Sequence, residues 1–158
     1  TPGISDPGFM LVRECAKLGV EVECLPGATA FVPALVQSAL PNDKFCFEGF
    51  LPQKKGRETR MQILANDPRT SIIYESPYRL VKTLEQLAKV CGEDRPAAVC
   101  REISKRFADT QRGTLRELID HFTANEPKGE IVMLLGGLPE VPKEKKVHKN
   151  KYKDLDEE

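Results

Sequence analysis

The start of the chain combines residue types that let a ligand approach the backbone closely. Residues 1–8 read Thr-Pro-Gly-Ile-Ser-Asp-Pro-Gly, with two glycines and two prolines just before a predicted helix. Glycine leaves room beside the backbone, and a helix N-terminus offers free N–H groups. In a parallel α/β sheet such a loop lies at the carboxyl end of a strand, where ligands bind. The segment is a candidate binding loop, although a simple turn has the same composition. Because the chain starts inside this motif, without methionine, we expect a piece of a longer protein.

A second group of residues has the chemistry of a phosphate-binding surface. Lys54, Lys55, Arg57 and Arg60 lie within seven residues, opposed only by Glu58, at the start of a predicted helix. They predict contacts to RNA phosphates, which provide affinity without sequence reading. A solvated helix face explains them equally well. The whole chain has 24 basic and 24 acidic residues, so any RNA contact must come from a local patch.

Several classes of site and protein are excluded by what the chain lacks. Its five cysteines form no CxxC pair, and its two histidines complete no zinc-ligand spacing, so no metal is expected. Cys15, Cys24, Cys46 and Cys100 stand among apolar residues and are predicted to be core residues of a cytoplasmic protein. No apolar run approaches the roughly 18 residues that span a bilayer, so no membrane partner is expected.

Strand and helix patterns alternate along the chain and predict an α/β fold. Asp6 is the expected N-cap of a first helix that Gly19 ends, followed by a strand over 20–25 and a helix over about 29–40. The further expected strands are 44–50, 70–75, 97–102, 107–112 and 130–135, and the further expected helices are 57–66, 79–90 and 115–125.

A turn signal at Pro41-Asn42-Asp43 is the predicted domain boundary. We therefore expect residues 1–41 to end a first domain, residues 42–138 to form a second, and residues 139–158 to be a charged tail. Six lysines lie between Lys143 and Lys153, followed by four acids. The tail is predicted to be solvated, with a basic arm for RNA phosphates as the alternative.

Six spaced motifs together carry a family resemblance. They are Thr1 to Gly8, Leu25-Pro26-Gly27-Ala28-Thr29-Ala30, Phe47-Glu48-Gly49-Phe50-Leu51-Pro52, Tyr74-Glu75-Ser76-Pro77-Tyr78-Arg79-Leu80, Arg101-Glu102-Ile103-Ser104-Lys105 and Lys128-Gly129-Glu130. In this order they closely resemble the tetrapyrrole methylase superfamily over about residues 1–137. The EGFLP and ESPYRL segments resemble the branch that methylates the ribose 2′-hydroxyl of a cytidine in 16S rRNA.

The resemblance implies a fold, a cofactor and partners. The family has two α/β domains, with S-adenosylmethionine in the cleft between them, and usually forms a homodimer. This chain would then hold the end of a parallel-sheet first domain, followed by a second α/β domain with a five-stranded mixed sheet. The implied partner is 16S rRNA or the small ribosomal subunit. Two alternatives stay open, namely methylation of a tetrapyrrole-like small molecule and an inactive fragment that only dimerises or binds RNA.

Cofactor-binding positions follow from matching motif to motif. The matched positions are Thr1, Ile4, Thr29, Ala30, Glu75 and Ile103. Thr29 and Ala30 match a pair whose small side chains leave room for the ligand, whereas Ile103 could simply be a core residue. Glu130 and Ile131 resemble a final contact strand, with weaker motif support.

The implied reaction places demands on nearby charged residues. A ribose hydroxyl is a poor nucleophile, so a base or a cation that stabilises the alkoxide would help. Glu102 and Lys105 are the predicted catalytic residues. Arg79 and Arg101 are predicted to hold RNA phosphate oxygens through their planar guanidinium groups. Each of these residues could instead form an ordinary salt bridge.

Overall fold

The computed structural model describes residues 2–139. The expectations for Thr1 and for the lysine-rich tail lie outside the described residues.

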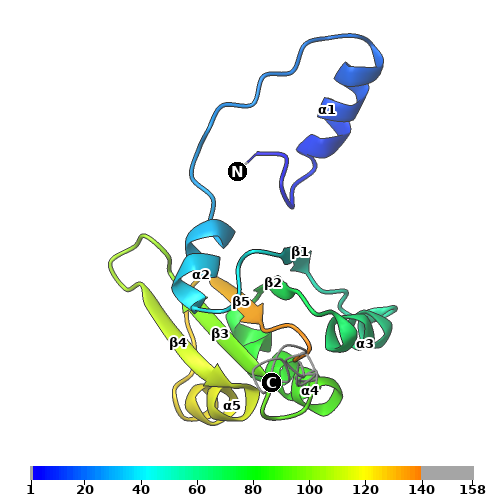
Figure 1. The fold of residues 1–158 in the computed structure, drawn as a ribbon. Helices are drawn as coiled ribbons and strands as arrows, with labels where there is room; N and C mark the ends of the chain where they lie inside the picture. Colours follow the sequence, from blue (N-terminus) through cyan, green and yellow to red (C-terminus); the bar gives the residue numbers. More distant parts are fainter. Residues whose placement is uncertain (1, 140–158) are drawn as a thin grey trace, which may run out of the picture.

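A five-stranded mixed sheet forms the centre of the described chain, as predicted (Figure 1). Its strands are β1 (Phe45–Phe50), β2 (Thr70–Glu75), β3 (Pro96–Arg101), β4 (Asp109–Thr114) and β5 (Ile131–Leu135), in the order β1-β2-β5-β3-β4. The β1–β2 pair is parallel, whereas β5 runs antiparallel to both β2 and β3. All five residues of β5 are apolar and buried, as is typical of a central strand that is covered on both faces of the sheet.

Helices cover both faces of the sheet and enclose two apolar clusters. On one face lie α3 (Arg57–Asn66), α4 (Leu80–Cys91) and α5 (Leu115–Ala124), and on the other lies α2 (Phe31–Ser38). The helix predicted over 79–90 is found as α4, and its Leu80, Leu84 and Leu87 are fully buried against the sheet. The start of α5 is secured by a capping box between Thr114 and Glu117.

The strand directions bring several chain segments to one edge of the sheet. Since β2 and β3 are both antiparallel to β5, their carboxyl ends lie together, beside the end of β1 and the start of β5. Glu75 and Arg101 are both paired with Ile131 at this position. We call it the carboxyl edge. It is defined by Phe50, Glu75, Arg101 and Ile131.

The N-terminal segment projects from the sheet (Figure 1) and corrects two predictions. The predicted strand over 20–25 is wrong: residues 20–29 form neither helix nor strand, because no described strand pairs with them. The first helix, α1 (Gly8–Lys17), has Pro7 as its N-cap rather than Asp6. The Asp6 carboxylate still accepts a hydrogen bond from the Gly8 N–H at 2.7 Å. Gly19 follows the helix with φ of 68°, as predicted.

The cysteine prediction holds for one of its four residues. Cys100 is fully buried beneath α2, but Cys15 and Cys46 are half-buried and Cys24 is exposed. The apolar neighbours of Cys24 belong to the N-terminal segment, which packs against little else in the described chain. The sequence pattern misled because apolar neighbours along the chain do not ensure neighbours in space.

Tertiary packing also affects the predicted domain boundary. The helix α2 precedes Pro41, yet Ala34 and Leu35 join the apolar cluster on the sheet of the second predicted domain. The Thr70 hydroxyl donates to the Pro41 carbonyl at 2.6 Å, which ties the boundary turn to β2. The division at Pro41 stays a prediction.

Candidate functional site at the carboxyl edge

A cavity of about 440 Å³ opens at the carboxyl edge. It is lined by Ala30 at the start of α2, by Phe50 at the end of β1, by residues 74–77 after β2, and by residues 129–132 leading into β5. Four segments that are distant in sequence therefore meet here. Concave sites with apolar walls and a few polar groups are typical of small-molecule binding.

Aromatic rings form part of the cavity wall. The Tyr74 ring contacts Phe47 and Phe50 edge-on, with centroids 5.2 and 5.7 Å apart. Burial raises the pKa of the Tyr74 hydroxyl, so the ring stays neutral. Ala30 adds little bulk opposite these rings. This wall can pack against a flat heteroaromatic group. The backbone around Gly129 and Ser76 contributes polar groups to the lining of the cavity.

Glu75, one of the cavity-lining residues, is the centre of a buried ion network. Glu75 is 4% exposed. Its Oε1 accepts hydrogen bonds from the Ser76 N–H at 2.7 Å and from Arg79 Nε at 2.9 Å. Its Oε2 accepts from the Thr83 hydroxyl at 2.8 Å, with Arg57 Nη2 at 3.8 Å. The carboxylate therefore bonds on the α4 side and holds the turn that borders the cavity. A cofactor contact by Glu75 stays a prediction.

The two predicted catalytic residues, Glu102 and Lys105, form a second network at the same edge. Glu102 Oε1 accepts from the Glu130 N–H at 2.8 Å and from Lys105 Nζ at 2.9 Å. Lys105 Nζ also donates to Glu130 Oε2 at 2.9 Å. Glu102 itself adopts a left-handed conformation, with φ of 50°. A side chain on Gly129 would overlap the Glu102 carboxylate, so the two loops fit closely.

These bonds determine which charges the pair carries. The hydrogen bond from the Glu130 N–H, and then that from Lys105, lower the pKa of Glu102. Hydrogen bonds to Glu130 and Glu102 raise the pKa of Lys105. An ionised Glu102 with a low pKa is a weak base, and a protonated Lys105 can only stabilise negative charge. Their catalytic roles stay predictions, with Lys105 the better suited of the two to an alkoxide.

We expect this pair to keep its charges throughout the neutral pH range. The Glu102 contribution should be present above 4.5, its ordinary pKa, and be lost as pH falls through the lowered value. The Lys105 contribution should be present below 10.5 and be lost as pH rises through the raised value. Carboxyl ¹³C NMR should give a Glu102 midpoint below 4.5 that moves upward in Lys105→Met. A midpoint above 4.5 in the parent protein would contradict this assignment.

The predicted RNA-binding cluster is divided by the structure. Lys54 and Lys55 are exposed, whereas the Arg57 side chain is only 13% exposed. Arg57 donates to the Pro52 carbonyl, and it also donates to side chains of α4. Arg60 pairs with the buried carboxylate of Glu48. RNA contact by all four stays a prediction, and Arg57 is the least accessible of them.

The two other predicted phosphate ligands lie at the carboxyl edge. Arg79 is bound to Glu75 but leaves 39% of its side chain exposed. Arg101 donates from Nη1 to the Lys128 carbonyl at 3.4 Å, a long hydrogen bond. Arg101 is the last residue of β3, and Arg79 follows the end of β2 by four residues, next to the cavity-lining segment 74–77. Their contact with RNA remains untested.

The remaining predicted cofactor residues lie around the same edge. Thr29 precedes Ala30, and its hydroxyl accepts from the Val32 N–H at 3.4 Å. Ile103 packs partly buried on the apolar cluster under α2, in agreement with the core interpretation. Ile4 is exposed, but its neighbour Ser5 places its hydroxyl against Gly49 of β1. Cofactor contacts by Thr29, Ile103 and Ile4 stay predictions.

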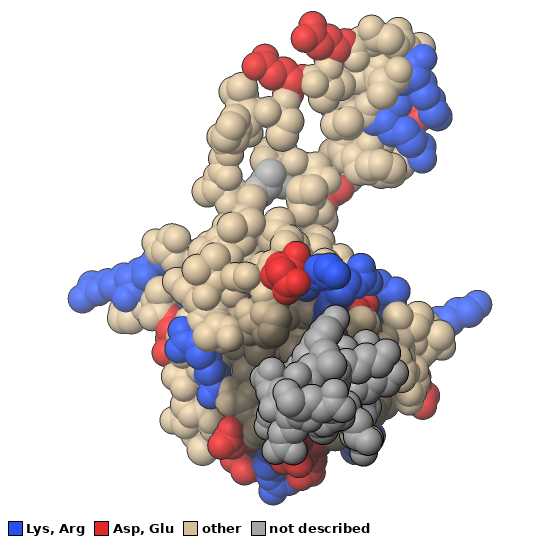
Figure 2. Space-filling model, in the orientation of Figure 1, with Lys and Arg blue, Asp and Glu red and all other residues tan. Residues whose placement is uncertain are grey.

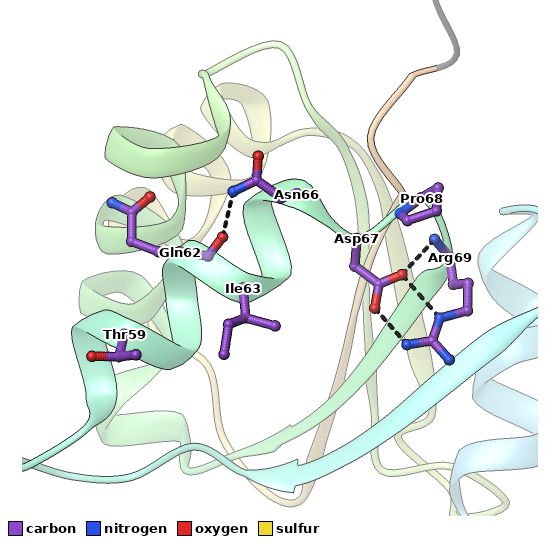
Figure 3. Close-up of a pocket in the computed structure, with 7 residues that line it drawn as sticks. All are labelled: Thr59, Gln62, Ile63, Asn66, Asp67, Pro68 and Arg69. Carbon is purple, nitrogen blue, oxygen red and sulfur yellow. Dashed lines mark hydrogen bonds and ion pairs between the residues drawn. The ribbon is translucent and has the colours of Figure 1, made fainter.

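Another hollow lies away from the carboxyl edge and is lined by none of the predicted site residues. It measures about 610 Å³ and is a shallow depression between one side of α3 and the Asp67–Arg69 turn (Figure 3). Two pairs of its polar groups already bond to each other, since Asp67 binds Arg69 and the Asn66 amide binds the Gln62 carbonyl (Figure 3). Within residues 2–139 no group of three histidine, cysteine, aspartate or glutamate residues could hold a metal ion. No helix in that range is long and apolar enough to cross a membrane.

Sequence reasoning missed several residues that line the cavity. Phe50, Tyr74, Ser76 and Pro77 were not among the predicted site residues, although all four stand inside the motifs quoted above. Their positions directly at the ends of predicted strands were the available signal. Side chains at such positions point into the crevice at the edge of an α/β sheet.

Comparison with known proteins identifies the family of this chain. Residues 1–119 match the family described as Tetrapyrrole (Corrin/Porphyrin) Methylases. The ribosomal RNA small subunit methyltransferase I of Synechocystis is 46% identical over 138 residues, which are 87% of this chain and 50% of that protein. The protein of that name from Thermotoga maritima is 41% identical, over 86% of this chain and 61% of its own length. The chain thus spans about half the length of most of these relatives.

Solved structures agree at the level of the fold. The methyltransferase CobJ superposes with a TM-score of 0.65 at 22% identity, covering 89% of this chain and 63% of that one. Uroporphyrin-III C-methyl transferase from Thermus thermophilus, complexed with S-adenyl homocysteine, gives 0.59 at 20% identity, covering 85% and 61%. Since the sequence match spans both the N-terminal segment and most of the sheet, the chain belongs to the family of tetrapyrrole (corrin/porphyrin) methylases.

Proposed function

We propose that this chain is part of a methyltransferase that uses S-adenosylmethionine and acts on the ribose 2′-hydroxyl of a cytidine in 16S rRNA. The supporting observation is the identity of 41–46% to proteins named ribosomal RNA small subunit methyltransferase I, which extends over the carboxyl-edge cavity. A homodimer in the cytoplasm, with 16S rRNA or the small ribosomal subunit as partner, belongs to the same proposal.

The cavity fits the adenosine side of such a donor. Phe50 and Tyr74 offer ring faces and edges to a purine, and Ala30 leaves space opposite them. Loops around Gly129 and Ser76 add backbone groups that can bond the ribose or the amino acid end. When bound, S-adenosylmethionine supplies an electrophilic methyl group on a sulfonium, which brings its own leaving group.

The charged residues would position the RNA and its hydroxyl. Lys105, held protonated by its two carboxylate partners, is placed to stabilise an alkoxide that develops at the edge of the cavity. Glu102 keeps its charge and orients Lys105. Methyl transfer requires the oxygen and the methyl carbon in line at about 3 Å, so orientation contributes much of the rate.

Methyl transfer by the full-length protein is the direct test of this function. Labelled donor is supplied with small ribosomal subunits, with free 16S rRNA, and with a tetrapyrrole such as uroporphyrinogen. We expect label at a ribose of 16S rRNA, and label in the tetrapyrrole alone would replace the proposal by small-molecule methylation. In the variant Ala30→Leu the cavity is partly filled, so donor affinity measured by calorimetry should fall at least about tenfold, which corresponds to about 1.4 kcal/mol. Ala124→Leu, on the exposed end of α5, is the matched control.

RNA affinity is expected to depend on Lys54 and Lys55 rather than on the tail. Replacing both by alanine should weaken rRNA binding for all sequences and flatten its salt dependence, because two phosphate contacts are lost. Arg57 is left intact, since its buried bonds would confound the result. Deletion of residues 141–158 should have a smaller effect, because four acids follow the six lysines. Binding is measured at two salt concentrations, and a larger loss from the deletion would assign RNA affinity to the tail.

A further inference from the structure

Two aromatic side chains near the carboxyl edge are largely exposed to solvent. Tyr78 is 91% exposed in the short 3₁₀ helix η1 (Pro77–Arg79) that follows β2, and Phe107 is 68% exposed in the loop between β3 and β4. Aromatic rings stabilise a fold by being buried, which neither ring achieves here. The segment before Tyr78 lines the cavity, and the loop that carries Phe107 is anchored to the cavity-lining residue Glu130. The exposed rings therefore flank a candidate binding site.

Both rings are carried by backbone that the structure holds firmly. The turn before Tyr78 is fixed by Pro77 and by the buried Glu75, which accepts from the Ser76 N–H. The loop that carries Phe107 contains left-handed Glu102 and Ser104, with φ of 50° and 62°, and is secured by Lys105. A ring on a rigid support loses little conformational entropy when it is covered by a ligand.

Each ring is adjacent in sequence to an arginine. Arg79 follows Tyr78 and keeps part of its guanidinium in solvent. The Arg106 guanidinium lies 5.5 Å from the centre of the Phe107 ring, and both residues are exposed. Figure 2 shows Lys or Arg side chains projecting at the left, where Figure 1 places the β3–β4 loop. The pairing of a flat ring with a cation matches the two parts of a nucleotide, its base and its phosphate.

We propose that Tyr78 and Phe107 are stacking platforms for unpaired RNA bases next to the methylated nucleotide, with Arg79 and Arg106 on the adjoining phosphates. This assignment rests on the proposed function and adds the form of RNA that is recognised. The bases of duplex RNA are stacked on one another and have no free face for a side chain, whereas splayed bases of single strands and loops do. Single-stranded RNA is therefore the expected occupant of this surface.

The test compares Tyr78→Leu and Phe107→Leu with the parent in the full-length protein. Leucine keeps apolar bulk but removes the ring face. The probes are a fluorescein-labelled, single-stranded oligoribonucleotide of 16S rRNA sequence containing cytidines, and the same strand in a duplex. Each variant should bind the single strand about five- to hundredfold more weakly, the range that stacking contributes per base. Duplex binding and donor affinity should stay at the parent level. Phe45→Leu, at the opposite end of β1, is the control and should bind both probes as the parent does.

Tryptophan variants give a readout that does not depend on affinity alone. These 158 residues contain no tryptophan, and Tyr78→Trp and Phe107→Trp each add an indole whose fluorescence, measured against the parent protein, is quenched when a base stacks on it. Quenching by the single strand, with affinity retained, supports the proposal. Parent-like RNA affinity in both leucine variants, or equal quenching by the duplex, overturns it. Methyl transfer is measured in parallel. If the parent protein methylates rRNA and the leucine variants bind RNA as the parent does, the stacking proposal is refuted but the proposed function is not. A parent that neither binds nor methylates rRNA refutes both proposals.

Discussion

Replacing Glu75 by glutamine is expected to destabilise the protein by about 3 kcal/mol, because breaking a buried ion pair leaves its partner charge uncompensated. The carboxylate is 4% exposed and the Arg57 side chain only 13%. Glutamine fills nearly the same volume but cannot balance Arg57 and Arg79, and its one amide oxygen can replace only one of the two carboxylate oxygens that accept from Ser76, Arg79 and Thr83. Urea unfolding of the full-length protein measures the change. Donor affinity should fall as well, since the Ser76 turn borders the cavity.

Two comparisons separate this network from a general effect of removing charge. Glu85→Gln alters an exposed residue on α4, the same helix that carries Thr83, and should change the free energy of unfolding by less than about 0.5 kcal/mol. The double variant Glu75→Gln/Arg57→Gln should lose less unfolding free energy than the sum of the losses in the two single variants. The reason is that the second change removes the Arg57 charge that the first leaves without its partner. Additive losses would show that Arg57 and Glu75 are not coupled, although they lie 3.8 Å apart.

Replacing Gly137 by alanine should destabilise the protein to a similar degree, for a steric reason. A Cβ at this position would overlap the Pro68 carbonyl and lie 2.9 Å from the Arg69 backbone nitrogen. These are backbone atoms of the turn between α3 and β2, the turn drawn in Figure 3, and they cannot rotate away. The neighbouring Leu138 N–H donates to the Asp67 carbonyl at 2.7 Å, which fixes this approach. Overpacking of this kind typically costs about 1–3 kcal/mol and occasionally more, and we expect the upper part of that range.

Gly27→Ala is the matched control for Gly137→Ala. At Gly27 the nearest atom to an added Cβ is the Leu25 carbonyl oxygen at 4.0 Å, an ordinary contact. That substitution should leave thermal stability unchanged or slightly increased, because alanine restricts the unfolded chain. If Gly137→Ala unfolds at the same temperature as Gly27→Ala, the close approach of residue 137 to the Pro68 turn is not maintained in solution.

Local signals in the sequence were sufficient for most of the regular elements. The predicted strand 70–75 and the predicted helix 57–66 have the bounds found in the structure. Buried apolar runs and helical spacing identify such segments without knowledge of their neighbours. The strand predicted over 107–112 lies two residues later, at Asp109–Thr114. The strained loop through Glu102 and Ser104 extends to residue 108, and Thr114 serves as the cap of α5.

What the sequence by itself determined was the order of elements and, through its spaced motifs, the family. The partners of individual charges were decided only by the tertiary structure. Arg57 and Lys55 look alike in a basic cluster, yet packing of α3 against α4 buries one and leaves the other exposed. The strand over 20–25 failed for a related reason: an extended segment becomes a strand only when another strand pairs with it. Side-chain pairing and burial depend on contacts between distant residues, which local patterns do not contain.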